Sequence, residues 1–290
     1  MKPMLAMDYK KRGHNITYPA YVQPKLDGIR CLATRKGDTI SYTSRDEKEF
    51  PAVSHLTPHL LRLMRDGDVW DGELYTKKLT FQEIVSAVKR NKTTNPDTAK
   101  IEYHVYDIAL SYGIDGYVVR NMPFEQRHLY VDAAIKNGGP IVPVTTLLVD
   151  CEEDMLACHK TMLAHGYEGT MVRNKDGMYI DKRSSDLQKY KDMEDAEFKI
   201  IDAIQGEGKD VGCIIFVCST PNPKGVKVKG KKQYEDLVFT VRPNGDYARR
   251  ERWWKERKQL IGKMLTVQYQ GLSDDGIPRF PIGLEVRDYE

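Results

Sequence analysis

The chain has 290 residues, with 45 Lys and Arg against 42 Asp and Glu, so its formal net charge is only +3. Its composition, 40% hydrophobic and 30% charged, can supply one large core or two smaller ones and excludes a disordered tail or linker. An apolar run of about eighteen residues is lacking, which excludes a membrane-spanning helix, and Asp8 precedes any apolar segment of the kind found in secretory signals. The 5 cysteines form no Cys-x-x-Cys pair, and we interpret them as reduced core residues of an intracellular protein.

Predicted strands dominate the first two thirds of the chain, with helices between them. β-Branched and aromatic residues predict strands at residues 21–25, 29–35, 39–43, 69–75, 101–110, 141–149, 168–173 and 187–191. Turns are expected at Asp27-Gly28 and at residues 36–38. Helices are expected at residues 51–64, from the capping box Thr80–Glu83 to about residue 90, at 123–135, and from Asp150 as N-cap to about residue 165.

The last third of the chain has the pattern of a second domain. Strands are expected at residues 197–205, 213–220, 237–242, 264–270 and 283–286, with one helix at 247–260. Such a set is typical of a small OB barrel, a fold that binds nucleic acid. The charged segment 191–195 marks the expected boundary between a domain of residues 1–193 and one of residues 194–290. Trp253 and Trp254 are interpreted as a helix face packed on this barrel, in preference to base stacking.

The sharpest chemical signal is the hexapeptide Lys25-Leu26-Asp27-Gly28-Ile29-Arg30. A lysine amine becomes a nucleophile when neighbouring cations or desolvation favour its neutral form. The Asp-Gly step predicts a tight turn that lets the backbone approach a ligand closely. The plain alternative is an ordinary hairpin with exposed charges.

Other charged residues lie in predicted strands and strengthen the chemical interpretation. Asp71-Gly72-Glu73 ends an apolar strand, and Glu168-Gly169 opens another. Lys189 and Lys191 alternate, so both should face one side of a strand. Lysines suit a polyphosphate and carboxylates suit its Mg²⁺, whereas this set is unsuited to a core.

In their order and spacing these elements resemble the ATP-dependent DNA ligases, within the superfamily that also contains RNA ligases and mRNA capping enzymes. Lys25 resembles the adenylated lysine of motif I, Ser44-Arg45 resembles motif Ia, and Asp71-Gly72-Glu73 resembles motif III. Tyr106-Asp107 is similar to motif IIIa, Glu168-Gly169 to motif IV, and Lys189 with Lys191 to motif V. The resemblance covers nearly the whole chain and is closest to the minimal viral and bacterial type. It implies an α+β fold: a nucleotidyltransferase domain of antiparallel sheets with flanking helices, followed by a C-terminal OB-fold β-barrel.

The resemblance also implies roles for single residues. Lys25 would attack the α-phosphate of ATP, AMP would pass to the 5′-phosphate of a nick in duplex DNA, and the 3′-OH would then expel AMP. The remaining implied contacts are adenine stacking by Tyr106, a base contact by Gln23, ribose and nick contacts by Asp27 and Arg30, ribose and Mg²⁺ or Mn²⁺ binding by Glu73, metal binding by Glu168, α-phosphate binding by Lys189 and Lys191, and 5′-phosphate binding by Arg45 and Arg183.

The C-terminal motif departs from the family pattern. Relatives place an Arg ahead of an Asp-Lys pair, whereas this chain closes Arg287-Asp288-Tyr289-Glu290. In the family this segment orients the pyrophosphate leaving group. That role would fall to Arg287, helped by Arg279.

A basic segment lies between two apolar strands of the predicted barrel. It contains five lysines and no acid: Lys224, Lys227, Lys229, Lys231 and Lys232. It resembles the latch by which minimal viral ligases clasp duplex DNA, and a solvated loop is the equal alternative.

The sequence therefore predicts a monomeric, intracellular ATP-dependent DNA ligase acting on nicked duplex DNA. An RNA ligase or a GTP-dependent capping-type nucleotidyltransferase is the alternative within the superfamily. A catalytically inactive OB-containing nucleic-acid-binding protein is the alternative from another class.

Overall fold

The computed structural model describes residues 1–89, 95–112, 118–137, 139–222, 235–273 and 275–287. The chain divides into two compact units, Met1–Lys191 and Asp192–Glu290. The lysine-rich segment 224–232 lies outside the described residues. Within the described ranges, every helix is too short or too polar to cross a membrane.

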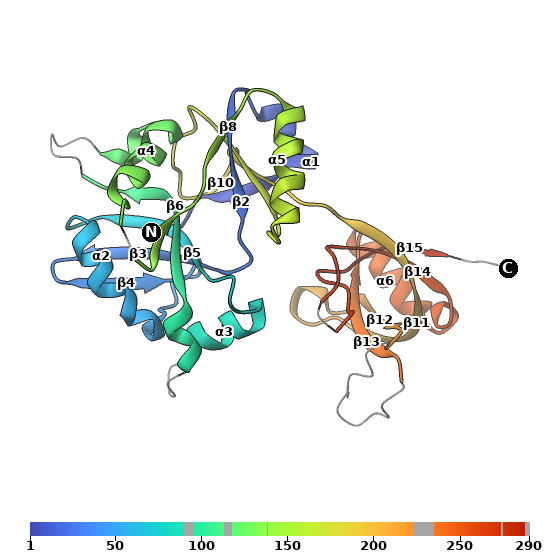
Figure 1. The fold of residues 1–290 in the computed structure, drawn as a ribbon. Coiled ribbons are helices and arrows are strands. Elements are labelled where there is room, and N and C mark those ends of the chain that lie inside the picture. Colours follow the sequence, from blue (N-terminus) through green and yellow to red (C-terminus); the bar gives the residue numbers. More distant parts are fainter. Residues whose placement is uncertain (90–94, 113–117, 138, 223–234, 274, 288–290) are drawn as a thin grey trace. The chain divides into compact units, whose positions relative to one another are not determined.

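The first unit contains two five-stranded sheets (Figure 1). One has the order β1 (Leu5–Asp8), β10 (Arg183–Tyr190), β9 (Gly169–Asn174), β2 (Ala20–Lys25) and β8 (Leu147–Val149). The other has the order β4 (Thr39–Thr43), β3 (Ile29–Lys36), β5 (Val69–Tyr75), β6 (Glu102–Leu110) and β7 (Ile141–Pro143). Their strand pairs are antiparallel except for β1–β10 and β6–β7, which are parallel.

Helices cover the sheets, and apolar side chains fill the layers between them. The helical elements of this unit are α1 (Tyr9–Arg12), η1 (Gly13–Asn15), η2 (Pro51–Leu56), α2 (Thr57–Leu63), α3 (Phe81–Lys89), η3 (Pro96–Lys100), η4 (Val119–Asn121), α4 (Phe124–Ala134) and α5 (Glu152–Ala164). Side chains of η2, α2, α3 and α4 join the core of the β3–β5–β6 sheet, whereas α1 and α5 pack on β2 and β9. A third cluster, which includes Leu32, Ala109 and Leu187, contains residues of both sheets and ties them together.

The Asp27-Gly28 turn carries the chain from one sheet to the other. β2 pairs with β8 and β9, while β3 pairs with β4 and β5, so the ordinary-hairpin alternative is wrong. A Cβ at Gly28 would lie 2.5 Å from the carbonyl oxygen of Leu74, so only glycine allows this close approach to β5. The turn thereby fixes the positions of Lys25, the last residue of β2, and Arg30, the second residue of β3.

Several local predictions are confirmed and others are wrong. In the confirmed capping box, the Thr80 amide donates to Glu83 Oε2 at 2.8 Å and the Glu83 amide donates to Thr80 Oγ1 at 3.4 Å. The single strand predicted at 141–149 is two short strands, β7 and β8, in different sheets. The single helix predicted at 51–64 is divided into the 3₁₀ helix η2 and the α-helix α2, and the backbone at Val53 inside η2 is not helical. The N-cap of α5 is Cys151, and Asp150 is therefore not the cap.

The second unit is a closed five-stranded barrel. Its strands follow the order β11 (Glu194–Gln205), β12 (Ile214–Thr220), β13 (Leu237–Pro243), β15 (Ile282–Arg287) and β14 (Met264–Tyr269), with η5 (Gly208–Asp210), α6 (Tyr247–Lys255) and α7 (Arg257–Leu260) between them. Burial alternates along β12, which places Phe216 in the core. The Trp253 ring packs 5.6 Å from that of Phe216, and Trp254 is partly buried against the same core. The interpretation of these tryptophans as a helix face packed on the barrel is confirmed.

Candidate active site

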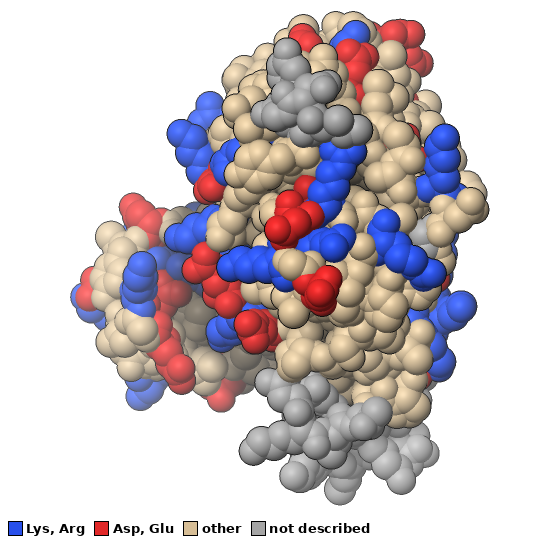
Figure 2. All heavy atoms as spheres, turned by 90° about the vertical axis from the view of Figure 1, so that its left-hand side faces the viewer, with Lys and Arg blue, Asp and Glu red and all other residues tan. Residues whose placement is uncertain are grey.

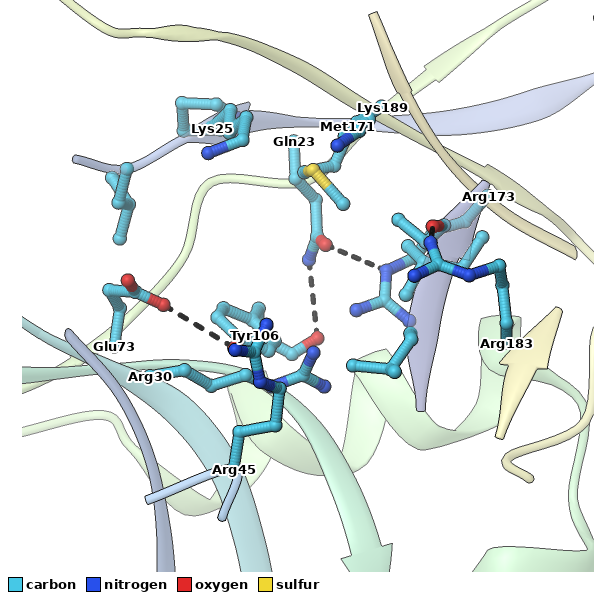
Figure 3. A pocket seen from close by; sticks show the side chains of 15 residues that line it. Gln23, Lys25, Arg30, Arg45, Glu73, Tyr106, Met171, Arg173, Arg183 and Lys189 are labelled. Atoms are coloured by element: carbon cyan, nitrogen blue, oxygen red, sulfur yellow. Dashed lines mark hydrogen bonds between the residues drawn. The ribbon is translucent and has the colours of Figure 1, made fainter. Parts of the chain in front are cut away.

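A pocket of about 280 Å³ lies between the two sheets of the first unit. Figure 3 shows side chains from both sheets pointing into the same space. The lining residues from the β1–β10–β9–β2 sheet and the turn after β2 are Leu5, Ala6, Gln23, Pro24, Lys25, Leu26, Met171, Arg173, Arg183, Leu187 and Lys189; those from the facing sheet and its loops are Arg30, Arg45, Glu73 and Tyr106.

Strand register explains why residues so distant in sequence meet here. Gln23 pairs with Met171 across β2 and β9, and Met171 pairs with Lys189 across β9 and β10, which forms one row. Arg30 pairs with Glu73 across β3 and β5. Because alternate residues of a strand share a face, Lys25 lies on the same face as Gln23.

Lys25 belongs to a chain of three charges. The Glu168 carboxylate accepts hydrogen bonds from Nζ of Lys25 and from Nζ of Lys191. Burial alone would raise the pKa of Glu168, but the two lysines outweigh it and hold that pKa below its usual range. Burial and the neighbouring Lys25 charge lower the pKa of Lys191. The site thus keeps one carboxylate ionised between two amines, one of which lines the pocket.

The pKa of Glu73 is shifted in the opposite direction from that of Glu168. Tyr106 donates a hydrogen bond of 3.5 Å to Glu73 Oε2. Burial raises the pKa of Glu73 to about 8, although Lys25 and Arg30 oppose the shift. Burial therefore favours the protonated form of this carboxyl group, whereas an arriving cation would favour its ionised form.

This raised pKa predicts how stability varies with pH. Glu73 has a pKa of about 8 in the folded chain against 4.5 ordinarily, so the folded state holds its proton across that interval. The contribution of Glu73 to the free energy of unfolding therefore falls as pH rises from about 4.5 to about 8. Glu73→Gln cannot ionise and should lose this part of the decline. Urea unfolding measures the free energy of unfolding of wild type and Glu73→Gln at several pH values. The same dependence of that free energy on pH in both proteins would contradict the prediction.

Metal binding was predicted for Glu73 and Glu168. Within the described ranges, three or more His, Cys, Asp or Glu side chains never gather into a ready-made metal site. Mg²⁺ commonly uses only one or two carboxylates, with waters and nucleotide phosphates completing its shell. Two carboxylates, Glu73 in the pocket lining and Glu168 bound to Lys25 beside it, fit that donor set.

The predicted ligand-binding residues do not all reach the pocket. Arg30 lines it and lies 5.6 Å from the centre of the Tyr106 ring, while its guanidinium also pairs with buried Asp71, with a distance of 3.0 Å from Nε to Oδ1. Lys189 and Tyr106 line the pocket as well. Asp27 is not among the lining residues.

Arg45 and Arg183, the predicted phosphate contacts, both line the pocket and are exposed. Arg183 NH1 donates to the carbonyl oxygen of Ala6, which anchors it beside β1. Arg45 also borders a second cavity of about 590 Å³, shared with Lys48 and Lys89. On the face that Figure 2 presents, Lys and Arg side chains lie among Asp and Glu, consistent with the small net charge.

Two further predicted residues belong to the barrel unit. Arg287 donates from Nε to Thr266 Oγ1 at 2.8 Å and lies 3.7 Å from a carboxylate oxygen of Glu197. The guanidinium of Arg279 lies 5.7 Å from the centre of the Phe280 ring. Their leaving-group role stays a prediction.

Sequence reasoning missed a buried polar network behind the pocket. Arg173 donates from Nε to Gln23 Oε1 at 2.8 Å and from NH1 to Asp107 Oδ2 at 2.7 Å. Asp107 Oδ1 also accepts a hydrogen bond of 2.7 Å from Nε of Arg127. The available signal was the presence of charged residues within predicted strands, namely Asp107 in 101–110 and Arg173 in 168–173.

Comparison with known families gives the class of protein. The family model for the ATP dependent DNA ligase domain matches residues 3–191, and that for the DNA ligase OB-like domain matches residues 216–287. Since the first match alone spans more than half of the chain, the chain belongs to the ATP-dependent DNA ligase family. Members of that family use ATP, so the nucleotide predicted from the motifs is supported.

Individual relatives agree with this assignment. The DNA ligase of African swine fever virus (isolate Warthog/Namibia/Wart80/1980) is 33% identical over 272 residues, covering 89% of this chain and 61% of its own length. The DNA ligase of Enterobacteria phage T4 is 21% identical over 335 residues, covering 98% of this chain and 68% of its own. The chain thus spans about three fifths of the length of the African swine fever virus ligase and about two thirds of that of the phage ligase.

Solved structures share the fold. A structure described as "DNA binding with a minimal scaffold: Structure-function analysis of Lig E DNA ligases" has a TM-score of 0.76 at 22% identity and covers 99% of both chains. The Chlorella virus DNA ligase-adenylate has a TM-score of 0.53 at 24% identity, covering 100% of this chain and 99% of its own. The predicted fold class, a nucleotidyltransferase domain followed by an OB barrel, is confirmed.

Proposed function

We propose that this chain seals nicks in duplex DNA through a covalent lysyl-AMP intermediate on Lys25. The observation that carries the proposal is the placement of Lys25 Nζ on the wall of a nucleotide-sized pocket, in a charge chain with Glu168 and Lys191. A lysine with only a structural role would not have to line such a cavity.

The first step follows from this geometry. Unprotonated Lys25 Nζ attacks the α-phosphorus of ATP, a P–N bond forms, the bond to the bridging oxygen breaks, and pyrophosphate leaves. Ionised Glu168, next to Nζ, accepts the proton or stabilises the ammonium form before attack. Lys189 and Lys191 stabilise negative charge that builds on the α-phosphate.

The base and the metal have separate places in this proposal. Tyr106, which lines the pocket, stacks on adenine, and Gln23 contacts its edge. Glu73 and Glu168 would hold Mg²⁺ or Mn²⁺, which neutralises phosphate charge when bound. Asp27 is proposed to contact the ribose or the nick termini once the substrate is bound.

The DNA contacts are proposed from charge. Exposed Arg45 and Arg183 would hold the 5′-phosphate of the nick. An oxygen of that phosphate attacks the phosphorus of the lysyl-AMP, a new pyrophosphate bond forms, and the P–N bond to Lys25 breaks. The 3′-OH then attacks that phosphate and expels AMP. Lys224, Lys227, Lys229, Lys231 and Lys232 are proposed to bind the DNA backbone, and Arg287 with Arg279 to orient pyrophosphate in the first step.

The test uses the full chain with ATP and Mg²⁺, read by intact mass and by sealing of a labelled nicked duplex. A gain of one AMP, removed by added pyrophosphate, and a joined strand are expected. Labelling only by GTP would favour a capping-type enzyme, and joining only on a nicked RNA would favour an RNA ligase. Binding of DNA without labelling or joining would indicate an inactive OB-containing protein.

A further inference from the structure

Gln23 has an amide group whose orientation is fixed by its neighbours. Its Oε1 accepts from Nε of Arg173 at 2.8 Å, and a guanidinium can only donate. Its Nε2 donates to the carbonyl oxygen of Tyr106 at 3.3 Å, which can only accept. These two contacts exclude the flipped amide, an alternative that must otherwise be decided from the surrounding network.

A third hydrogen-bond partner, Thr146, is consistent with the same orientation of the Gln23 amide. Gln23 Nε2 also donates to Thr146 Oγ1 at 2.9 Å. The hydroxyl hydrogen of Thr146 is directed at the Val144 carbonyl, 2.9 Å away, so Oγ1 is left as an acceptor. Both amide hydrogens of Gln23 are therefore engaged, and the second lone pair of Oε1 is its remaining hydrogen-bonding capacity.

Arg173 is held rigidly enough to impose this orientation. It is 3% exposed, its NH1 is bound to Asp107 at 2.7 Å, and its guanidinium lies 4.4 Å from the centre of the Phe124 ring. Asp107 also accepts two hydrogen bonds from Arg127, one from Nε to Oδ1 at 2.7 Å and one from Nη2 to Oδ2 at 3.1 Å. Burial would raise the pKa of Asp107, but Arg127 and Arg173 outweigh it and keep this anchor ionised.

We propose that Arg173 is a positioning residue which, through Gln23, makes the pocket prefer a purine with a 6-amino group over one with a 6-oxo group. This inference rests on the proposed function, since it places the base of the nucleotide next to Gln23. Because Gln23 presents an acceptor, a 6-amino group can donate to it, whereas a 6-oxo group places two acceptors face to face. A site that leaves a buried polar group unpaired rejects such a ligand strongly.

The experiment compares ATP with inosine triphosphate, which carries a 6-oxo group and no 2-amino group. The preference for ATP is measured in two ways for wild type and Arg173→Met. The first ratio is kcat/KM for Lys25 labelling with ATP divided by kcat/KM with inosine triphosphate. The second is the equilibrium dissociation constant for inosine triphosphate divided by that for ATP. We expect both ratios to fall by roughly ten-fold or more, the value of one lost hydrogen bond. Arg173→Lys, which keeps a donor near Oε1, should restore part of the preference.

Arg127→Met is the matched control. It also removes a buried cation from Asp107, but Arg127 has no hydrogen bond to Gln23 among the described contacts. It should therefore lower stability without changing the preference. Gln23→Met should lower the preference by itself, and adding Arg173→Met should lower it no further, because Arg173 acts through Gln23.

The outcomes separate this inference from the proposed function. A wild type that binds ATP in preference to inosine triphosphate without becoming labelled would overturn the proposed chemistry and leave the base preference standing. An unchanged ratio in Arg173→Met, or an equal loss in Arg127→Met, would overturn the positioning role. If Arg173→Met fails to fold, the ratios of Arg173→Lys and Gln23→Met decide the matter, and wild-type ratios in both would overturn the proposal.

Discussion

Lys25→Ala should show no AMP-sized mass gain with ATP and Mg²⁺, and its labelling rate should fall by roughly 10⁴-fold or more, as expected when a covalent nucleophile is removed. The side chain is 21% exposed and lies at the pocket wall, so its loss should disturb packing little. Intact mass and circular dichroism measure the two effects.

Lys25→Arg is the matched control for charge. Its guanidinium keeps a cation opposite Glu168 but stays protonated and cannot attack phosphorus. Both variants should therefore fail to become labelled, while both should still join a nick that already carries AMP on its 5′-phosphate, because that step needs no lysyl-AMP. An adduct mapped to Lys189 or Lys191 would refute the assignment of the nucleophile.

The elements that carry the motifs could be predicted from sequence because their signals are local. Strand β5 was predicted at its observed limits, residues 69–75, from its apolar and aromatic content. The alternation of residues within β2 and β10 places Lys25 and Lys189 on the pocket side, as strand geometry requires. These motif residues could thus be assigned to strands without knowledge of the neighbouring strands.

Long-range pairing could not be predicted in the same way. Residues 141–149 are rich in β-branched residues, yet β7 pairs with β6 and β8 pairs with β2, so tertiary contacts divide this segment between two sheets. Strand β1 is only four residues long and depends on parallel pairing with β10, from the other end of the unit. Sequence patterns contain no signal for such distant partners.

The buried network was missed for a related reason. Asp107 and Arg173 each look unsuited to a strand interior when their own segments are considered. Their stability depends on each other and on Arg127, because a buried charge is tolerated only when it is paired and hydrogen-bonded. Only the folded structure shows that the three charges meet.

Glu168→Gln tests whether the central carboxylate does more than connect two lysines. The amide keeps the shape of the side chain but loses the negative charge that compensates Lys25 and Lys191. Without it the two cations repel, and the group next to Nζ can no longer accept a proton and binds a metal ion only weakly. Labelling of Lys25 should therefore fall by roughly 10²-fold or more, the scale of a lost general base or charge-stabilising group.

A comparison of partial reactions separates the two roles of Glu168. Because Glu168 is also proposed to bind Mg²⁺, Glu168→Gln should be slow in joining a nick that is already adenylated, a step that Lys25→Ala should retain. Raising the Mg²⁺ concentration should recover part of that joining, because mass action compensates a weakened site. Glu168→Asp, which keeps the charge on a shorter side chain, should lie between wild type and Glu168→Gln in both steps. If Glu168→Gln joined the adenylated nick at the wild-type rate, with the same Mg²⁺ dependence, Glu168 would act only through the lysines, and the metal would have to be bound by Glu73 and the phosphates.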